Sequence, residues 1–231
     1  MATALAQSFN PDLVYEIGRL VGREMQIYDV ELWLAPGINI HRSIMCGRNF
    51  EYYSEDPYLT GVIGAAIVNG VQSIEGRMCC IKHYCCNNFE TNRFNSSSNV
   101  SERALREIYL PAFDYVIKHA NPAALMTSYN LVNGEHTSCS RDLLIKVLRS
   151  EMKYQGLVLT DWIASGQINF KRSKYPCKYA HQDLANGVNL VMPGSKKDIA
   201  DIYKGLKSQK ISVADLQNNA EIVYRFIMGE K

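Results

Sequence analysis

The feature that most constrains the fold is a regular alternation of two kinds of segment along the chain. Short, nearly continuous apolar runs occupy residues 30–34, 78–81, 123–126, 157–159 and 188–192. Between them, apolar residues recur at helical spacing over residues 11–27, 57–71, 101–119, 140–154, 196–207 and 212–228. Short apolar runs are typical of parallel strands buried on both faces, whereas the longer segments predict amphipathic helices.

This alternation predicts an α/β fold, because right-handed crossovers place the helices outside a parallel sheet. Polar side chains follow successive runs: Arg48 after the first, Lys82 and His83 after the second, Tyr129 after the third and Asp161 after the fourth. Polar groups at the carboxyl ends of many strands are typical of a barrel. An open sheet usually carries a glycine-rich phosphate loop, which this sequence lacks. We therefore predict a TIM-like (β/α) barrel with mostly parallel strands.

Composition narrows the classes of partner. With 231 residues, 47% of them hydrophobic, the chain can bury one sizeable core, so a single domain over residues 1–231 is expected. The 25 basic and 23 acidic residues are scattered, which argues against nucleic acid and against membrane surfaces as partners. The sequence shows neither a signal peptide nor a transmembrane segment. Location is unknown on this basis, with the cytoplasm as the default.

Cysteine and histidine patterns give no support for a metal or a disulfide framework. The seven cysteines are an odd number and include two adjacent pairs, whose side chains would point to opposite faces of a strand. We expect them to be small buried residues. The five histidines lie far apart, so a metal-dependent hydrolase barrel has little support. No metal and no cofactor is predicted.

Asp161 is the first candidate for chemistry, since an apolar run delivers this carboxylate and then Trp162 to a strand end. The alternative is that Asp161 caps the next helix, a common role for Asp. Trp162 favours a sugar ligand because an aromatic face suits a sugar ring, although Trp is more often core. Lys82 and His83 follow the second run, where a structural ion pair and a core hydrogen bond are the alternatives to ligand binding.

Arg48, Arg93 and Tyr129 add directed donors in neighbouring loops. Such donors suit a neutral, polyhydroxylated ligand. From these residues alone, the chain is interpreted as a barrel enzyme with an acidic and basic pocket.

Ordered motifs along the chain extend this interpretation. They are APGINIHR at 35–42, GRNFE at 47–51, SEDP at 54–57, IKHY at 81–84 with the asparagines at 87 and 88, ETNR at 90–93, VSERALREIYL at 100–110, MTSYN at 126–130 and Thr160-Asp161-Trp162. Together they resemble the N-terminal barrel domain of glycoside hydrolase family 3 β-glucosidases, in which the last of these segments is similar to the Ser-Asp-Trp nucleophile motif.

The resemblance implies a retaining hydrolase of terminal β-D-glycosidic bonds that acts on β-linked glucosides or related oligosaccharides. Asp161 would be the nucleophile that forms a glycosyl-enzyme, which water hydrolyses with help from a second carboxyl group. The residues expected to bind the sugar are Arg48, Lys82, His83, Arg93, Met126, Tyr129 and Trp162.

Two departures from the family pattern bear on activity. We expect residues 1–231 to contain neither the strand with an Asp-Gly-Pro segment that opens the family's barrel nor the α/β sandwich domain that supplies the family's acid/base Glu. The second His of single-domain members is also absent after Lys82-His83. We therefore expect an incomplete barrel that lacks its first strand, a catalytically impaired fragment, and self-association through the open edge. The alternative is a non-catalytic carbohydrate-binding or structural barrel.

Overall fold

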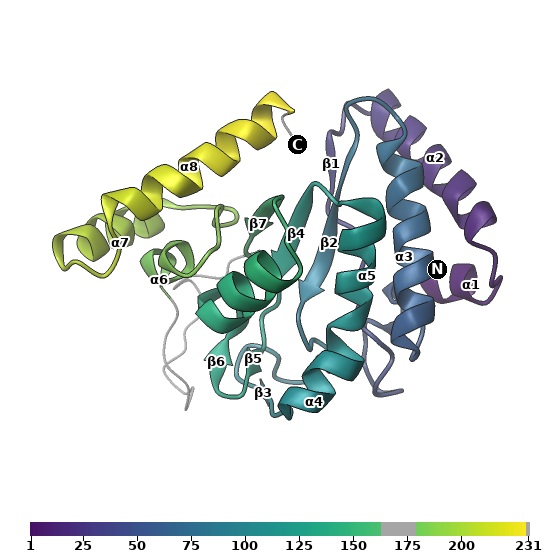
Figure 1. The fold of residues 1–231 in the computed structure, drawn as a ribbon, viewed down its shortest axis with the longest axis horizontal. Helices are drawn as coiled ribbons and strands as arrows, with labels where there is room; N and C mark the ends of the chain where they lie inside the picture. The colour runs from purple at the N-terminus through teal and green to yellow at the C-terminus, as the bar shows by residue number, and fades with distance from the viewer. Residues whose placement is uncertain (163–178, 230–231) are drawn as a thin grey trace. The chain divides into compact units, whose positions relative to one another are not determined.

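A computed structural model describes residues 1–162 and 179–229 of the chain (Figure 1). The chain divides into two compact units. The first comprises Met1–Arg93 and Val100–Leu125, and the second comprises Phe94–Asn99 and Met126–Lys231.

The first unit is built on a pair of long helices beside a parallel pair of strands. Its α-helices are α1 (Ala2–Ala6), α2 (Pro11–Ile27), α3 (Pro57–Gln72), α4 (Glu102–Ala104) and α5 (Pro111–Ala120). Its strands are β1 (Leu32–Trp33) and β2 (Met78–Tyr84), and short 3-10 and π turns span Asn49–Glu51 and Leu105–Tyr109. The helices predicted at 11–27 and 57–71 thus form with almost the expected bounds. The helix predicted at 101–119 is instead interrupted before Pro111, because proline has no N–H to continue the ladder.

Helices α2 and α3 lie side by side (Figure 1) because their facing glycines allow close approach. A methyl group at Gly70 would lie 2.1 Å from the backbone oxygen of Tyr15, and one at Gly18 would lie 2.5 Å from that of Ile67. Each helix begins with proline after a capping side chain, Asn10 for α2 and Asp56 for α3. This packing fixes the helical layer of the first unit.

Strand β2 forms the buried centre of the first unit. It pairs in parallel with β1, with Leu32 opposite Met78. The pairing continues beyond the predicted end of the run, since the Lys82 backbone accepts from Ile38 N at 2.7 Å and donates to Pro36 O at 3.0 Å. The expectation that Lys82 and His83 follow the strand is therefore wrong: they are part of its carboxyl-terminal end.

The second unit contains β7 (Leu157–Leu159), a strand of the four-stranded sheet to which β1 and β2 also belong, and a separate three-stranded sheet. Its other elements are β3 (Ser97–Ser98), β5 (Leu131–Val132), β6 (Glu135–His136), α6 (Ala180–Ala185), α7 (Lys196–Lys207) and α8 (Val213–Met228), with a 3-10 turn at Thr137–Cys139 and a π-helix at Asp142–Glu151. Strand β5 pairs in parallel with β3 and antiparallel with β6. The boundary between the units falls within β4 (Ala124–Thr127). In the strand order β1-β2-β4-β7, this strand is the neighbour of β2 and of β7.

The predicted strand at 188–192 forms only a single bridge, in which Leu190 pairs in parallel with Leu159. The pairing stops because the Met192 N–H donates to the Thr160 hydroxyl at 2.9 Å and Pro193 has no N–H. The segment predicted as a helix at 140–154 is a π-helix over Asp142–Glu151. The predicted helices at 196–207 and 212–228 form as α7 and α8, to within one residue.

Together these elements confirm the α/β class with mostly parallel strand pairing. The cysteines at 46, 79, 80, 85 and 86 are buried, as expected of small core residues. Across the residues that the structure describes, no helix is both long and apolar enough to cross a membrane. The absence of a first strand stays a prediction, and so does the single-domain organisation.

Candidate functional site

Arg48 and Lys82 share one carboxylate in the first unit. The Arg48 Nε donates to Glu51 Oε1, and the Lys82 Nζ lies 3.7 Å from Glu51 Oε2. Arg48 comes from the turn before Asn49–Glu51, whereas Lys82 comes from the end of β2. Only 16 to 23% of each of the three side chains is exposed. Glu51 therefore orients two cations from different elements.

His83, the neighbour of Lys82 on β2, is held by its backbone and by its ring. The Asn39 amide donates to His83 O at 2.9 Å and accepts from His83 N at 2.8 Å. The ring Nδ1 lies 3.2 Å from the hydroxyl of Tyr52, a fully buried side chain. Burial lowers the pKa of His83 well below its ordinary value, and the cations Arg48, Lys82 and Arg93 lower it further. The imidazole is therefore neutral near pH 7.

Arg93 is positioned by Glu90, whose Oε2 lies 2.7 Å from an Arg93 guanidinium nitrogen. The other oxygen of Glu90 accepts from Asn87 Nδ2 at 3.0 Å. Asn87 in turn lies within hydrogen-bond distance of the Tyr52 hydroxyl, at 3.3 Å. Arg93 and His83 thus belong to one connected network, which runs through Glu90, Asn87 and Tyr52.

Asp161 follows β7 in the second unit and is nearly buried, with 9% of its surface exposed. Its Oδ1 accepts from the Trp162 backbone N–H at 2.7 Å. The preceding Thr160 is fully buried and is fixed by its N–H, which donates to Leu190 O at 3.0 Å. The alternative role of Asp161 as a helix cap concerns residues after Trp162, which lie outside the described residues.

The other predicted residues of the second unit lie around the same strand ends. Tyr129 follows β4, donates its hydroxyl to the Trp162 backbone oxygen and packs edge-on against Phe94 at 4.6 Å between ring centres. Met126 is buried within β4, and the Trp162 side chain is 52% exposed. An exposed indole offers an aromatic face that suits a sugar ring.

The structure thus groups Arg48, Lys82, His83 and Arg93 in the first unit, and Tyr129, Asp161 and Trp162 in the second. That all of them act on one ligand stays a prediction. Four residues that hold these side chains had no predicted role. Glu51 and Glu90 pair with the cations, whereas Tyr52 and Asn87 link His83 to Glu90. A signal was available for the two glutamates, because each stands three residues from an arginine.

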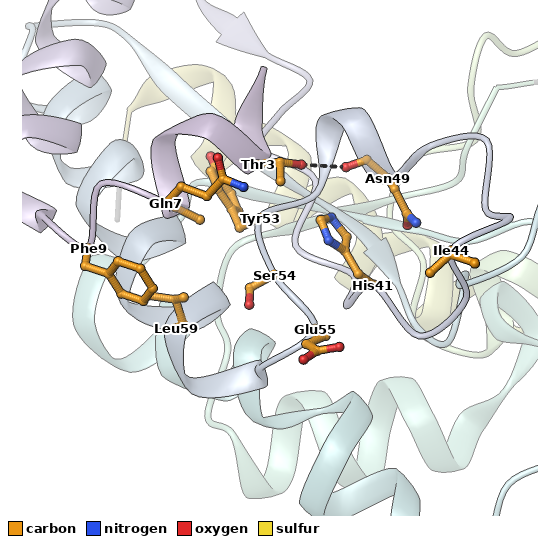
Figure 2. Close-up of a pocket in the computed structure, with 11 residues that line it drawn as sticks. Thr3, Gln7, Phe9, His41, Ile44, Asn49, Tyr53, Ser54, Glu55 and Leu59 are labelled. Carbon is orange, nitrogen blue, oxygen red and sulfur yellow. Dashed lines mark hydrogen bonds between the residues drawn. The ribbon is translucent and has the colours of Figure 1, made fainter.

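A separate hollow of about 400 Å³ lies in the first unit (Figure 2). Its wall includes Thr3 of α1 and Gln7, which follows α1, together with His41, Ser54 and Glu55. None of the predicted site residues lines it. Within residues 1–162 and 179–229, no three His, Cys, Asp or Glu side chains gather as metal ligands would.

The fold and these side chains define an α/β domain of the TIM-like barrel type that carries directed cationic and hydroxyl donors. Residues 1–226 match the Glycosyl hydrolase family 3 N terminal domain, and the chain belongs to that family. The membership confirms the resemblance inferred from the motifs.

Known relatives agree with this assignment. The chain is 46% identical to the β-glucosidase of Kluyveromyces marxianus over 228 residues, which cover 97% of this chain and 25% of that enzyme. It is 39% identical to the exo-α-(1->6)-L-arabinopyranosidase of Bifidobacterium breve, covering 95% of this chain and 27% of that protein. The structure of β-glucosidase 3B from Thermotoga neapolitana in complex with glucose matches with a TM-score of 0.87 at 40% identity, covering 95% of this chain and 30% of that one. The chain therefore spans about a quarter of the length of its curated relatives.

Proposed function

We propose that this chain is the nucleophile-bearing and sugar-binding domain of a retaining β-glucosidase, which hydrolyses terminal β-D-glycosidic bonds. The observation that carries the proposal is the set of preoriented donors in the first unit. Arg48, Lys82 and Arg93 can only donate hydrogen bonds, and Glu51 and Glu90 hold them in place. Such a set is suited to the hydroxyl oxygens of a neutral sugar, which accept several hydrogen bonds at once.

In this proposal Asp161 is the nucleophile. Its carboxylate attacks the anomeric carbon and forms an ester, while the bond to the leaving oxygen breaks and that oxygen takes a proton from an acid. Water then attacks the same carbon, gives its proton to the base and releases Asp161 as a carboxylate. Family membership and the position of Asp161 directly after a buried strand support this role.

The sugar-binding set in the proposal comprises two groups. Arg48, Lys82, His83 and Arg93 bind hydroxyl groups, whereas Met126, Tyr129 and Trp162 provide the apolar and aromatic contacts. Glucose is the favoured sugar because the matched Thermotoga neapolitana structure contains it. The arabinopyranosidase relative shows that another pyranose is used within similar sequences.

We assign no acid/base residue within residues 1–231, since the family resemblance assigns that role to a Glu of a sandwich domain. General acid/base assistance is worth roughly 10²- to 10⁴-fold in rate. The proposal therefore includes slow cleavage of unactivated glucosides by residues 1–231 alone. Self-association through a strand edge stays a prediction.

The test uses 2,4-dinitrophenyl β-glucoside, whose leaving group departs with little protonation, and azide as an external nucleophile for the second step. Asp161→Asn is expected to abolish turnover while the far-ultraviolet circular dichroism stays unchanged, because an amide is a far poorer nucleophile. Asp142→Asn is the matched control, since Asp142 lies on the exposed side of the π-helix and pairs with Lys146. Turnover that is equal in the two variants would overturn the role of Asp161.

A further inference from the structure

The directions of the hydrogen bonds around Asn87 are fixed by chemistry. Its Nδ2 lies 3.0 Å from Glu90 Oε1 and 3.3 Å from the Tyr52 hydroxyl oxygen. A carboxylate only accepts, so the atom of Asn87 that faces Glu90 must be the amide nitrogen. The same nitrogen donates its second hydrogen to the oxygen of Tyr52.

The direction of the next bond follows from the burial of Tyr52. This side chain is fully buried, so its O–H requires an acceptor. Among the residues that the structure describes, its hydroxyl contacts the Asn87 nitrogen, which donates, and His83 Nδ1 at 3.2 Å. Only Nδ1 can accept, and therefore Tyr52 donates to it.

The tautomer of His83 follows from that bond. The ring is 1% exposed and neutral, so it carries one proton. Because Nδ1 accepts from Tyr52, the proton lies on Nε2. The bonds from Asn39 to both backbone groups of His83 fix the backbone from which the ring projects.

Tyr52 is itself rigidly held, which makes it suited to this role. Its backbone oxygen accepts from the Thr3 hydroxyl at 3.0 Å and from His41 Nε2 at 2.9 Å. Its ring meets the His83 ring edge-on, with 6.3 Å between ring centres. A donor fixed at both ends loses little entropy when it holds its partner.

We propose that Tyr52 and Asn87 are positioning residues that fix His83 as its Nε2–H tautomer, so that His83 donates one hydrogen bond to a sugar hydroxyl. The sugar in this statement rests on the proposed function, whereas the tautomer does not. Asn87 also joins this chain of bonds to Glu90, which holds Arg93. One network therefore sets the direction of two sugar donors.

The experiment measures the ring nitrogens of His83 by long-range ¹H–¹⁵N correlation, together with the dissociation constant for glucose. The variant is Tyr52→Phe, which removes the hydroxyl and keeps the ring. The matched control is Tyr53→Phe, the same change in the neighbouring buried tyrosine. In the unchanged chain Nε2 is expected to be protonated. In Tyr52→Phe we expect the Nδ1 resonance to move and glucose to bind about 3- to 10-fold more weakly, as for one lost hydrogen bond. In Tyr53→Phe we expect neither the resonance nor the dissociation constant to change.

Asn87→Asp provides a second variant, in which the Tyr52 hydroxyl donates to the new carboxylate and the Nδ1 resonance again moves. Protonation of Nδ1 in the unchanged chain, or an Nδ1 resonance that Tyr52→Phe leaves in place, would overturn the positioning role. If the unchanged chain binds no glucose, the proposed function fails, and the ring nitrogens still decide whether Tyr52 and Asn87 fix the tautomer.

Discussion

Replacement of Glu51 by glutamine tests whether its carboxylate holds Arg48 and Lys82 in place. The substitution keeps the size of the side chain but removes its charge. Arg48 Nε and Lys82 Nζ then face an amide, half of which is itself a donor. Two partly buried cations would be left without their shared counter-ion.

The expected cost can be worked from the Lys82–Glu51 distance and the exposure. Opposite unit charges 3.7 Å apart attract by about 4 to 5 kcal/mol at an effective dielectric constant of about 20. Desolvation of the ions offsets much of this attraction, and the 16 to 23% exposure screens part of the rest. An exposed ion pair is worth only about 0 to 1 kcal/mol, whereas Glu51 is mostly buried and faces two cations. We therefore expect Glu51→Gln to lower the free energy of unfolding by about 2 kcal/mol.

Urea unfolding, followed by the fluorescence of Trp33 in β1 of the same unit, measures this difference. Glu16→Gln is the matched control, because Glu16 pairs with Arg19 at the same three-residue spacing on the exposed face of α2, with 60% of its side chain exposed. The control is expected to change stability by less than about 0.5 kcal/mol. Equal losses in the two variants would refute the reasoning that Glu51 is a counter-ion within a partly buried cluster.

Two further predictions address the helical layer and the buried histidine. Gly70→Ala is expected to destabilise the chain by about 1 to 3 kcal/mol, because the added methyl group would lie 2.1 Å from the backbone oxygen of Tyr15. Gly47→Ala is the neutral control, since no atom lies within 4 Å of the methyl group that it adds. Equal thermal midpoints in the two variants would contradict the close packing at Gly70. The lowered pKa of His83 means that below about pH 6.5 the unfolded chain binds a proton that the folded chain does not, so stability falls as the pH falls, by up to about 1.4 kcal/mol per pH unit. His83→Gln should reduce this slope between pH 6.5 and 5.5 in urea titrations, and a slope that the substitution leaves unchanged would argue against a buried neutral His83.

The helices and the class of fold could be predicted because they depend on local periodicity and caps. The bounds of α2 and α7 match the predicted segments, each opened by a capping side chain. The end of β2 could not be predicted, because Lys82 and His83 are polar and belong to the strand only through backbone bonds to the segment after β1. The strand predicted at 188–192 is wrong for the opposite reason. The segment is apolar, but the bond from the Met192 N–H to the Thr160 hydroxyl and the following proline limit its pairing to one bridge.

The candidate site was predictable where a motif names a residue, as for Asp161, Lys82 and His83. The residues that orient them were not predicted, because Tyr52, Asn39 and Asn87 act through contacts 31 to 44 positions apart in the sequence, or through one another. Spacing alone cannot show which hydroxyl meets which ring nitrogen. The exceptions are Glu51 and Glu90, whose distance of three residues from an arginine is a local pattern.

Covalent trapping is the most direct test of Asp161 as the nucleophile. A 2-deoxy-2-fluoro-β-glucoside with a dinitrophenyl leaving group should transfer its sugar to the nucleophile and stall there, because the fluorine slows the second step. We expect one fluoroglucosyl adduct, mapped by peptide mass spectrometry to Asp161 and absent from Asp161→Asn. An adduct on another carboxylate, or labelling that persists in Asp161→Asn, would contradict it.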